Sequence, residues 1–411
     1  MNRKAVLLIF ATALIIRIFY VVFVVDPSIN PFLFDDVDDY NRLANALLDG
    51  HGFVAADGKP TAWRPPLYPC FLAGIYALFG KNNFAAVQIV QALLGAAAAV
   101  MCGAIAFNIA SSNIAGFVGG ILAALNPMLV YYCGDLGTIA PFHFFVALLF
   151  FLLIRKKPHY FLSGIALGFA QLTRPTIIIL IPVLLFEPMQ KLWCDRVNVW
   201  KRFRDFFGKN IVKKQMCFIA GFMIVCLPWV VRNYYHFKKP IIGTTIAGAN
   251  LAYSISTAYL KTLGIEHLAL VQSIPESAGT SEKDYDETMK RIAIAAYLHN
   301  PLSSLRLYIA KLLHFFSLFP ASRSIAFRWI GFLSFGPLLL GALVWLLTVR
   351  RYYHCGLLLL CALWYAFFHC FFVSYIRLRV PVIEPIFIVL TAQTVDYFVA
   401  HRGDRGTMQT A

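Results

Sequence analysis

Long uninterrupted apolar runs recur along the 411-residue chain, and they constrain its fold more than any other feature. A run of about 20 apolar residues matches the hydrocarbon thickness of a bilayer. Sixty per cent of the residues are hydrophobic and only 14% are charged, too few for a water-soluble surface. We therefore expect lipid to be the main solvent. The clearest runs cover residues 5–25, 84–107, 113–132, 140–154, 326–348, 355–374 and 381–399.

Three weaker apolar segments complete the prediction. One, at 216–231, ends in Pro228-Trp229. Two more lie between Tyr160 and Phe186, split by Thr173-Arg174-Pro175, and we interpret them as a hairpin that turns below the outer surface. The first run resembles a signal peptide, but it is too long and lacks a small-residue cleavage site, so we expect a retained helix. The sequence predicts an all-α polytopic protein with about ten transmembrane helices in a single domain, 1–411.

Basic residues predict the orientation of these helices. The segment 191–214 has eight Lys or Arg residues against two Asp, and other basic clusters fall on the same side of a ten-helix layout. That side, with the basic loop 188–215 and both termini, is predicted to be cytoplasmic. The loops 26–82 and 233–325 are then outside, as a catalytic first loop and an accessory loop. The net charge of +16 follows this pattern, so we expect no nucleic-acid partner.

The first outer loop contains the densest acidity of the chain. Four carboxylates, Asp35, Asp36, Asp38 and Asp39, precede Tyr40 and a helical apolar pattern that suits a surface helix. One reading is N-capping, because carboxylates accept hydrogen bonds from the free amides of a helix start. The other is a general base or a cation site, since one cap needs only one or two carboxylates. Both readings stay open, and no strict ligand spacing supports a divalent cation.

Several arginines are predicted at the same outer side. Arg64 lies in a proline-rich segment with Trp63 and Tyr68, and Arg174 would sit within the membrane depth, where an ionisable residue is a functional candidate. Snorkelling to the surface is the alternative for Arg174. Cations facing carboxylates suit transfer from a lipid phosphate. Further cations at the outer ends of spans are Arg232, Arg377 and Arg379.

These motifs together resemble the bacterial membrane glycosyltransferases of the GT-C fold, in the glycosyltransferase 39 superfamily of protein O-mannosyltransferases and the lipid A aminoarabinose transferase. The resemblance covers most of the chain. The matching segments are Asp36 with Tyr40, Gly50-x-Gly52-Phe53, Pro60-Thr61-Ala62, Arg64-Pro65-Pro66-Leu67-Tyr68-Pro69, Leu172-Thr173-Arg174-Pro175, Pro228-Trp229 with Arg232-Asn233, Gly248-x-Asn250-Leu251 and Arg377-x-Arg379-x-Pro381.

The resemblance implies roles for individual residues. Asp36 would be the general base, with Asp35 and Asp39 as flanking candidates, and the arginines would bind the donor phosphate. Asp135 stands where many relatives have a Glu. Together with Asp135, the residues implied in substrate binding are Tyr40, Trp63, Tyr68 and Asn250.

The function implied is transfer of a sugar from a polyprenyl-phosphate donor, with inversion, to a glycan, lipid or protein acceptor. The enzyme would act at the outer face of the bacterial inner membrane, with no cofactor. No glycine fingerprint of a nucleotide-sugar site is present in the sequence. A flippase or transporter of a lipid-linked or anionic substrate is the main alternative, and a catalytically inactive envelope subunit is a weaker one. The sequence names neither the sugar nor the acceptor.

Overall fold

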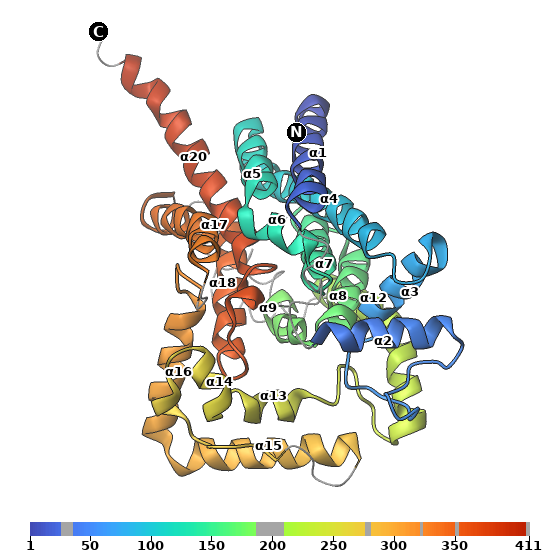
Figure 1. Ribbon diagram of the computed structural model, residues 1–411. Helices are drawn as coiled ribbons and strands as arrows, with labels where there is room; N and C mark the ends of the chain where they lie inside the picture. Colours follow the sequence, from blue (N-terminus) through green and yellow to red (C-terminus); the bar gives the residue numbers. More distant parts are fainter. Residues whose placement is uncertain (26–35, 186–208, 276–280, 321–323, 350–352, 408–411) are drawn as a thin grey trace.

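The computed structural model describes residues 1–25, 36–185, 209–275, 281–320, 324–349 and 353–407 of the chain. Across these ranges the regular structure is helical, with two isolated β-bridges. The start of α1 and the end of α20 lie at one end of the molecule, and α2, α13 and α15 lie at the other (Figure 1). The expected all-α architecture is confirmed.

Five helices are long and apolar enough to cross a membrane, among the residues described. Their spans agree with the apolar runs in the sequence, because an apolar residue in lipid needs its backbone hydrogen bonds satisfied within the helix. These helices are α1 (Arg3–Phe19) with its continuation η1 (Tyr20–Val24), α4 (Phe84–Ala110), α12 (Lys209–Phe237), α17 (Ile325–Val344) with η4 (Trp345–Val349), and α20 (Ile383–Thr407).

A sixth candidate span is bent. The run predicted as one helix over 113–132 is divided into α5 (Asn113–Leu125) and α6 (Pro127–Gly134), which meet at 46°. The prediction of an unbroken helix was wrong here. Pro127 has no amide hydrogen and disfavours helical geometry at Asn126, whose side chain instead caps the backbone amide of Leu129 at 2.9 Å.

Shorter apolar helices fill the rest of the bundle. The predicted break at Arg174 is present, since α8 ends at Thr173 and the next helical turn begins at Pro175. The count of about ten spanning helices included all of these short elements except α3, and it stays a prediction because length and composition alone support five or six among the described helices. They are α3 (Leu67–Phe79), α7 (Ile139–Leu153), α8 (Tyr160–Thr173), η2 (Pro175–Leu180) with α9 (Ile181–Leu185), and α18 (Tyr353–His369).

Helices of the two long loops cover the opposite end from the termini. The predicted helix after the acidic cluster is present as α2, and α15 runs across the lower edge of the molecule (Figure 1). Besides α3, these loop helices are α2 (Asp36–Leu48), α13 (Ala247–Tyr253), α14 (Thr257–Thr262), η3 (Glu266–Leu268), α15 (Glu282–His299) and α16 (Pro301–Phe315). The short α19 (Ile376–Arg379) lies between α18 and α20.

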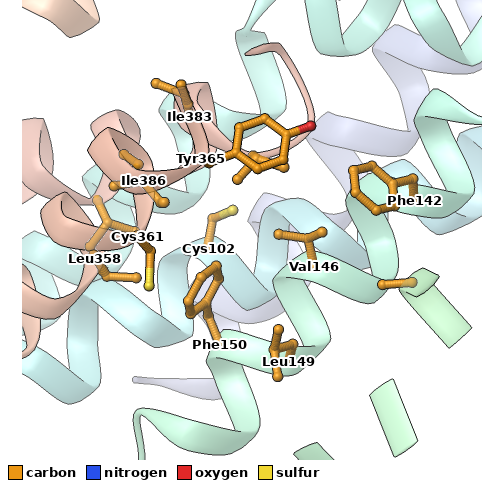
Figure 2. Close-up of a cluster of buried hydrophobic side chains, with 14 of the residues drawn as sticks. Cys102, Phe142, Val146, Leu149, Phe150, Leu358, Cys361, Tyr365, Ile383 and Ile386 are labelled. Carbon is orange, nitrogen blue, oxygen red and sulfur yellow. The ribbon is translucent and has the colours of Figure 1, made fainter. Parts of the chain in front are cut away.

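The core joins helices that are far apart in sequence. Cys102 of α4 and Phe150 of α7 lie in one cluster with Cys361 and Tyr365 of α18 and Ile386 of α20 (Figure 2). Elsewhere α8 and α12 approach so closely that a Cβ atom at Gly164 would lie 2.0 Å from the carbonyl oxygen of Phe218. Small residues at such a crossing allow the backbones to touch. This packing holds α8, and with it the position of Arg174 at its end.

Candidate active site

A cavity of about 1200 Å³ lies where the first long loop, the end of α8, the 241–253 segment and the 368–378 segment meet. Its lining combines cationic, uncharged polar, aromatic and aliphatic side chains. The polar and aromatic lining residues are Tyr40, Trp63, Arg64, Gln171, Thr173, Arg174, Thr176, Thr244, Asn250, Tyr253, Thr262, Phe368, His369, Phe372, Tyr375 and Arg377.

Three of the five predicted arginines line this cavity. Arg174 follows the last residue of α8 in an extended conformation (φ −145°, ψ 108°), because Pro175 disfavours helical geometry at the residue before it. The guanidinium of Arg64 lies 5.6 Å from the ring centroid of Tyr40, and that of Arg377 lies 5.3 Å from the ring centroid of Tyr375. The cavity therefore concentrates positive charge contributed by three separate segments.

Arg379 does not line the cavity. Its side chain is fully buried, 3.4 Å from Glu384, and it donates to the carbonyl oxygens of Phe315 and Ser317 at 2.9 Å each. Its guanidinium also lies 3.6 Å from the centre of the Phe335 ring. A buried guanidinium that is paired and hydrogen-bonded in this way ties α16, α19 and α20 together.

Arg232 also lies outside the cavity lining. It donates to the carbonyl oxygens of Thr61 and Phe53, at 2.6 Å each, and its guanidinium is 5.0 Å from the Trp229 ring. These contacts hold the end of α12 against the first long loop. The guanidinium donors of Arg232 are directed at backbone groups. We therefore do not assign Arg232 or Arg379 to phosphate binding.

The acidic cluster is described only in part. Asp35 lies outside the described residues, and so does the side chain of Asp36, whose backbone begins α2. Asp39 is described: its carboxylate is 3.2 Å from Arg42 and 3.4 Å from Arg64. The first turns of α2 therefore reach the cavity, through the pair of Asp39 with Arg64 and through the ring of Tyr40.

The predicted substrate-binding residues divide as well. Tyr40, Trp63 and Asn250 line the cavity. Tyr68 is buried beneath Tyr40, packs edge-on against its ring at 5.3 Å, and donates to Gln91 at 3.1 Å. Tyr68 thus supports the cavity wall without reaching the cavity.

Asp135 lies in the turn between α6 and α7, buried and outside the cavity lining. Burial raises the pKa of its carboxyl to about 6, whereas the positive charges of Arg377 and Arg174 lower it. Among the described residues, no hydrogen-bond partner reaches its Oδ1 atom. The Asp135 carboxylate therefore interacts electrostatically with two of the three cavity arginines, Arg377 and Arg174.

Glu282, the first residue of α15, was not anticipated from the sequence. Its carboxylate accepts a hydrogen bond from the Thr61 hydroxyl, one from the backbone amide of Ala62 at 3.1 Å, and one from the Thr245 hydroxyl at 3.1 Å. It connects the two long loops at the rim of the cavity. No local pattern marks it, because its partners lie up to 221 residues away.

Gln171 and His369 were also missed, although a signal existed. Both are polar residues inside apolar runs, and such residues are functional candidates in a membrane protein. In the part of the chain that the structure describes, no three His, Cys, Asp or Glu side chains come together as metal ligands. Most of the acidic cluster lies outside that search, so the divalent cation stays an open expectation.

Comparison with known proteins agrees with this architecture. Residues 63–231, less than half of the chain, match the family described as dolichyl-phosphate-mannose-protein mannosyltransferase. No match was found among curated proteins. Among solved structures, the oligosaccharyltransferase of Archaeoglobus fulgidus, tethered to an acceptor peptide, has a TM-score of 0.57 at 14% identity over 96% of this chain. This chain spans only 50% of that one.

Two structures of ArnT from Cupriavidus metallidurans are also similar. The complex with undecaprenyl phosphate has a TM-score of 0.41 at 13% identity, covering 96% of this chain and 78% of that chain. The apo form has the same TM-score and identity, covering 95% and 77%. The chain has the GT-C fold, the class of fold that its sequence motifs indicated.

Proposed function

We propose that this protein is a membrane glycosyltransferase that moves a sugar from a polyprenyl-phosphate donor to an acceptor of the cell envelope. The observation that carries the proposal is the cavity lined jointly by Arg64, Arg174 and Arg377. Guanidinium groups bind phosphate oxygens through paired, charge-assisted hydrogen bonds. Residues 63–231 match a family whose description names dolichyl phosphate mannose, a lipid-phosphate-linked sugar, and this agrees with the proposed donor.

The remaining lining suits a lipid-linked donor. Ile178, Ile179, Phe368 and Phe372 supply apolar surface in the same cavity. In our proposal the phosphate binds at the arginines, and the first isoprene units lie against these side chains. This division explains why a transferase would place its site between a helical bundle and its outer loops.

The reaction we propose is a single displacement. The acceptor hydroxyl oxygen attacks the anomeric carbon of the sugar and forms a new C–O bond, and its proton passes to the Asp36 carboxylate. The bond between the anomeric carbon and the phosphate oxygen breaks, and its electron pair leaves with polyprenyl phosphate. Attack from the side opposite the phosphate inverts the anomeric centre. The arginines stabilise the leaving phosphate.

The place of α2 supports Asp36 as the base. Asp36 is four residues before Tyr40, which lines the cavity, and three before Asp39, which pairs with the cavity residue Arg64. Positions three and four apart share one helix face. We propose that the acceptor approaches from the outer face of the membrane, between α2 and the helices of the 233–325 loop.

Radiolabel transfer tests the proposal. Purified protein is incubated with a set of polyprenyl phosphates that carry radiolabelled sugars, together with a membrane extract as the source of acceptor. Label that moves from the lipid to a second product supports a transferase. Label that stays on the lipid, with movement between leaflets of reconstituted vesicles, supports a flippase and contradicts our proposal.

A further inference from the structure

Two uncharged polar side chains in the cavity have polar atoms without a hydrogen-bond partner among the residues that the structure describes. Gln171, in the last turn of α8, is 1% exposed, and His369, the last residue of α18, is 4% exposed. Buried polar groups are nearly always hydrogen-bonded, and leaving one unsatisfied destabilises the fold. Two such groups in one cavity point to a ligand that completes them.

The contacts of each side chain identify the unused atoms. Within the described part of the chain, Oε1 of Gln171 and both ring nitrogens of His369 make no hydrogen bond. Backbone groups of His369 and Val373 approach the ring as weak hydrogen-bonding partners, but neither reaches good hydrogen-bond geometry with a ring nitrogen. Phe315 and Tyr365 pack against the imidazole, with ring centroids at 5.7 and 5.1 Å. Packing therefore restricts the ring while its polar edge stays available.

Both side chains lie beside the proposed phosphate site. Gln171 is three residues before Arg174, and the Arg174 charge acts on the His369 imidazole. A carboxamide both donates and accepts hydrogen bonds, as does a neutral imidazole. Phosphate oxygens only accept, whereas a sugar hydroxyl does both. The unused atoms thus match hydroxyl groups next to a phosphate.

We infer that Gln171 and His369 bind hydroxyl groups of the donor's sugar, beside the phosphate held at Arg174. The inference rests on the proposed function and adds to the cavity a subsite that binds the sugar of the donor. The ligand class is a lipid-linked sugar with free hydroxyls close to its anomeric phosphate. Selectivity for the donor over the spent lipid would then come from these two residues.

The test compares binding of two kinds of lipid in detergent solution. The probes are bare polyprenyl phosphate and a panel of the same lipid carrying mannose, glucose, galactose or arabinose. We expect at least one sugar-bearing lipid to bind more tightly than the bare lipid. Gln171→Leu and His369→Phe should each weaken that binding about tenfold, the loss typical of one hydrogen bond, while bare polyprenyl phosphate binds unchanged.

Matched controls exist elsewhere in the bundle. Gln393 of α20 and His143 of α7 are also buried, and each has a side-chain polar atom with no partner in the described ranges, but neither lines the cavity. Gln393→Leu and His143→Phe should bind both kinds of lipid as the wild type does. Retained binding of the bare lipid shows in every variant that the phosphate site is folded.

Each contrary result has its own meaning. If no sugar-bearing lipid of the panel binds more tightly than the bare lipid, the sugar subsite is refuted and the phosphate site survives. If the two variants lose both kinds of lipid equally, their role is structural and the inference fails. If the wild-type protein binds neither kind of lipid, the proposed function itself is overturned.

Discussion

The five arginines predicted at one side of the membrane have different surroundings in the structure. Arg379 is buried against Glu384 and backbone carbonyl groups, and Arg232 binds backbone carbonyl groups of the first long loop. Arg64, Arg174 and Arg377 line the cavity. A guanidinium acts as a ligand site only where its donors face the ligand, so the position of each residue decides its role.

Arg174 should contribute to donor binding. We expect Arg174→Ala to weaken binding of polyprenyl phosphate by about 10- to 100-fold, the range for a charged hydrogen-bonding partner. Equilibrium binding of radiolabelled lipid measures this. Arg306→Ala, on an exposed residue of α16, is the control and should bind normally. Equal affinity of the wild-type and Arg174→Ala proteins would contradict the phosphate role.

Asp36 should be required for the chemical step alone. Replacing it with Asn removes the proton acceptor while nearly preserving size, so we expect the transfer rate to fall by at least about 100-fold with donor binding retained. The control is Asp49→Asn, because Asp49 is an exposed residue just after α2 that pairs with Lys81 at 2.8 Å. The Asp49→Asn protein should transfer sugar at the wild-type rate. Substantial transfer by the Asp36→Asn protein would move the base elsewhere.

Asp135 should make stability depend on pH. Its pKa is raised from 3.8 to about 6, so the folded state holds the proton more tightly than the unfolded state, and stability falls as pH rises through this window. We expect Asp135→Asn to gain thermal stability relative to the wild type at pH 7.5, by at most about 3 kcal/mol, and to gain less at pH 5. Thermal melts at both pH values measure the difference. An equal gain at the two pH values would show that this carboxyl does not titrate there.

At the scale of elements, the crossing of α8 and α12 determines the position of α8, the first helix of the predicted hairpin. A Cβ atom at Gly164 would lie 2.0 Å from the carbonyl oxygen of Phe218, and one at Gly221 would lie 2.0 Å from the carbonyl oxygen of Phe161. Neither position accepts a side chain unless the helices separate. The apolar pattern predicts both helices, but only their contact explains why glycine stands at these two positions.

Gly164→Ala should separate α8 from α12. We expect a lower thermal midpoint and a lower transfer rate, because Arg174 lies at the end of the displaced helix. Gly356→Ala is the matched control: nothing lies within 4 Å of its Cβ position in α18, and alanine favours a helix by about 1 kcal/mol over glycine. Unchanged melting of the Gly164→Ala protein would show that this crossing tolerates a methyl group.

At the scale of the whole molecule, contacts between the two long loops form the rim of the cavity. Glu282 of α15 binds Thr61 and Thr245, and Arg232 at the end of α12 binds Phe53 and Thr61. The loop helices lie together at the end of the bundle opposite the start of α1 and the end of α20 (Figure 1). One side of the membrane should therefore hold the whole site.

The basic residues predict which side that is. On a background without native cysteines, Lys261→Cys in α14 should react with a membrane-impermeant maleimide in intact cells, because we expect its loop to be outside. Lys156→Cys, between α7 and α8, should react only after permeabilisation. Both replaced lysines are exposed. The reverse labelling pattern would invert the predicted topology.

Local sequence determined the helices, their proline breaks and the residues that could bind a phosphate. A long apolar run in lipid must form a helix to satisfy its backbone hydrogen bonds, and proline removes one backbone donor from such a helix. Both effects act between residues that are close in sequence. The break at Asn126 shows the limit, since Pro127 lies within an apolar run whose length alone predicts one continuous helix.

Only the tertiary structure decided which cations share a cavity, which one is enclosed as an ion pair, and which polar residues complete the site. Arg232 contacts a residue 179 positions away and Glu282 contacts one 221 positions away. Pairs at such separations leave no periodicity in the sequence, because they depend on how whole helices pack. Gln171 and His369 became candidates for the same reason, once α8 and α18 had brought them to one cavity.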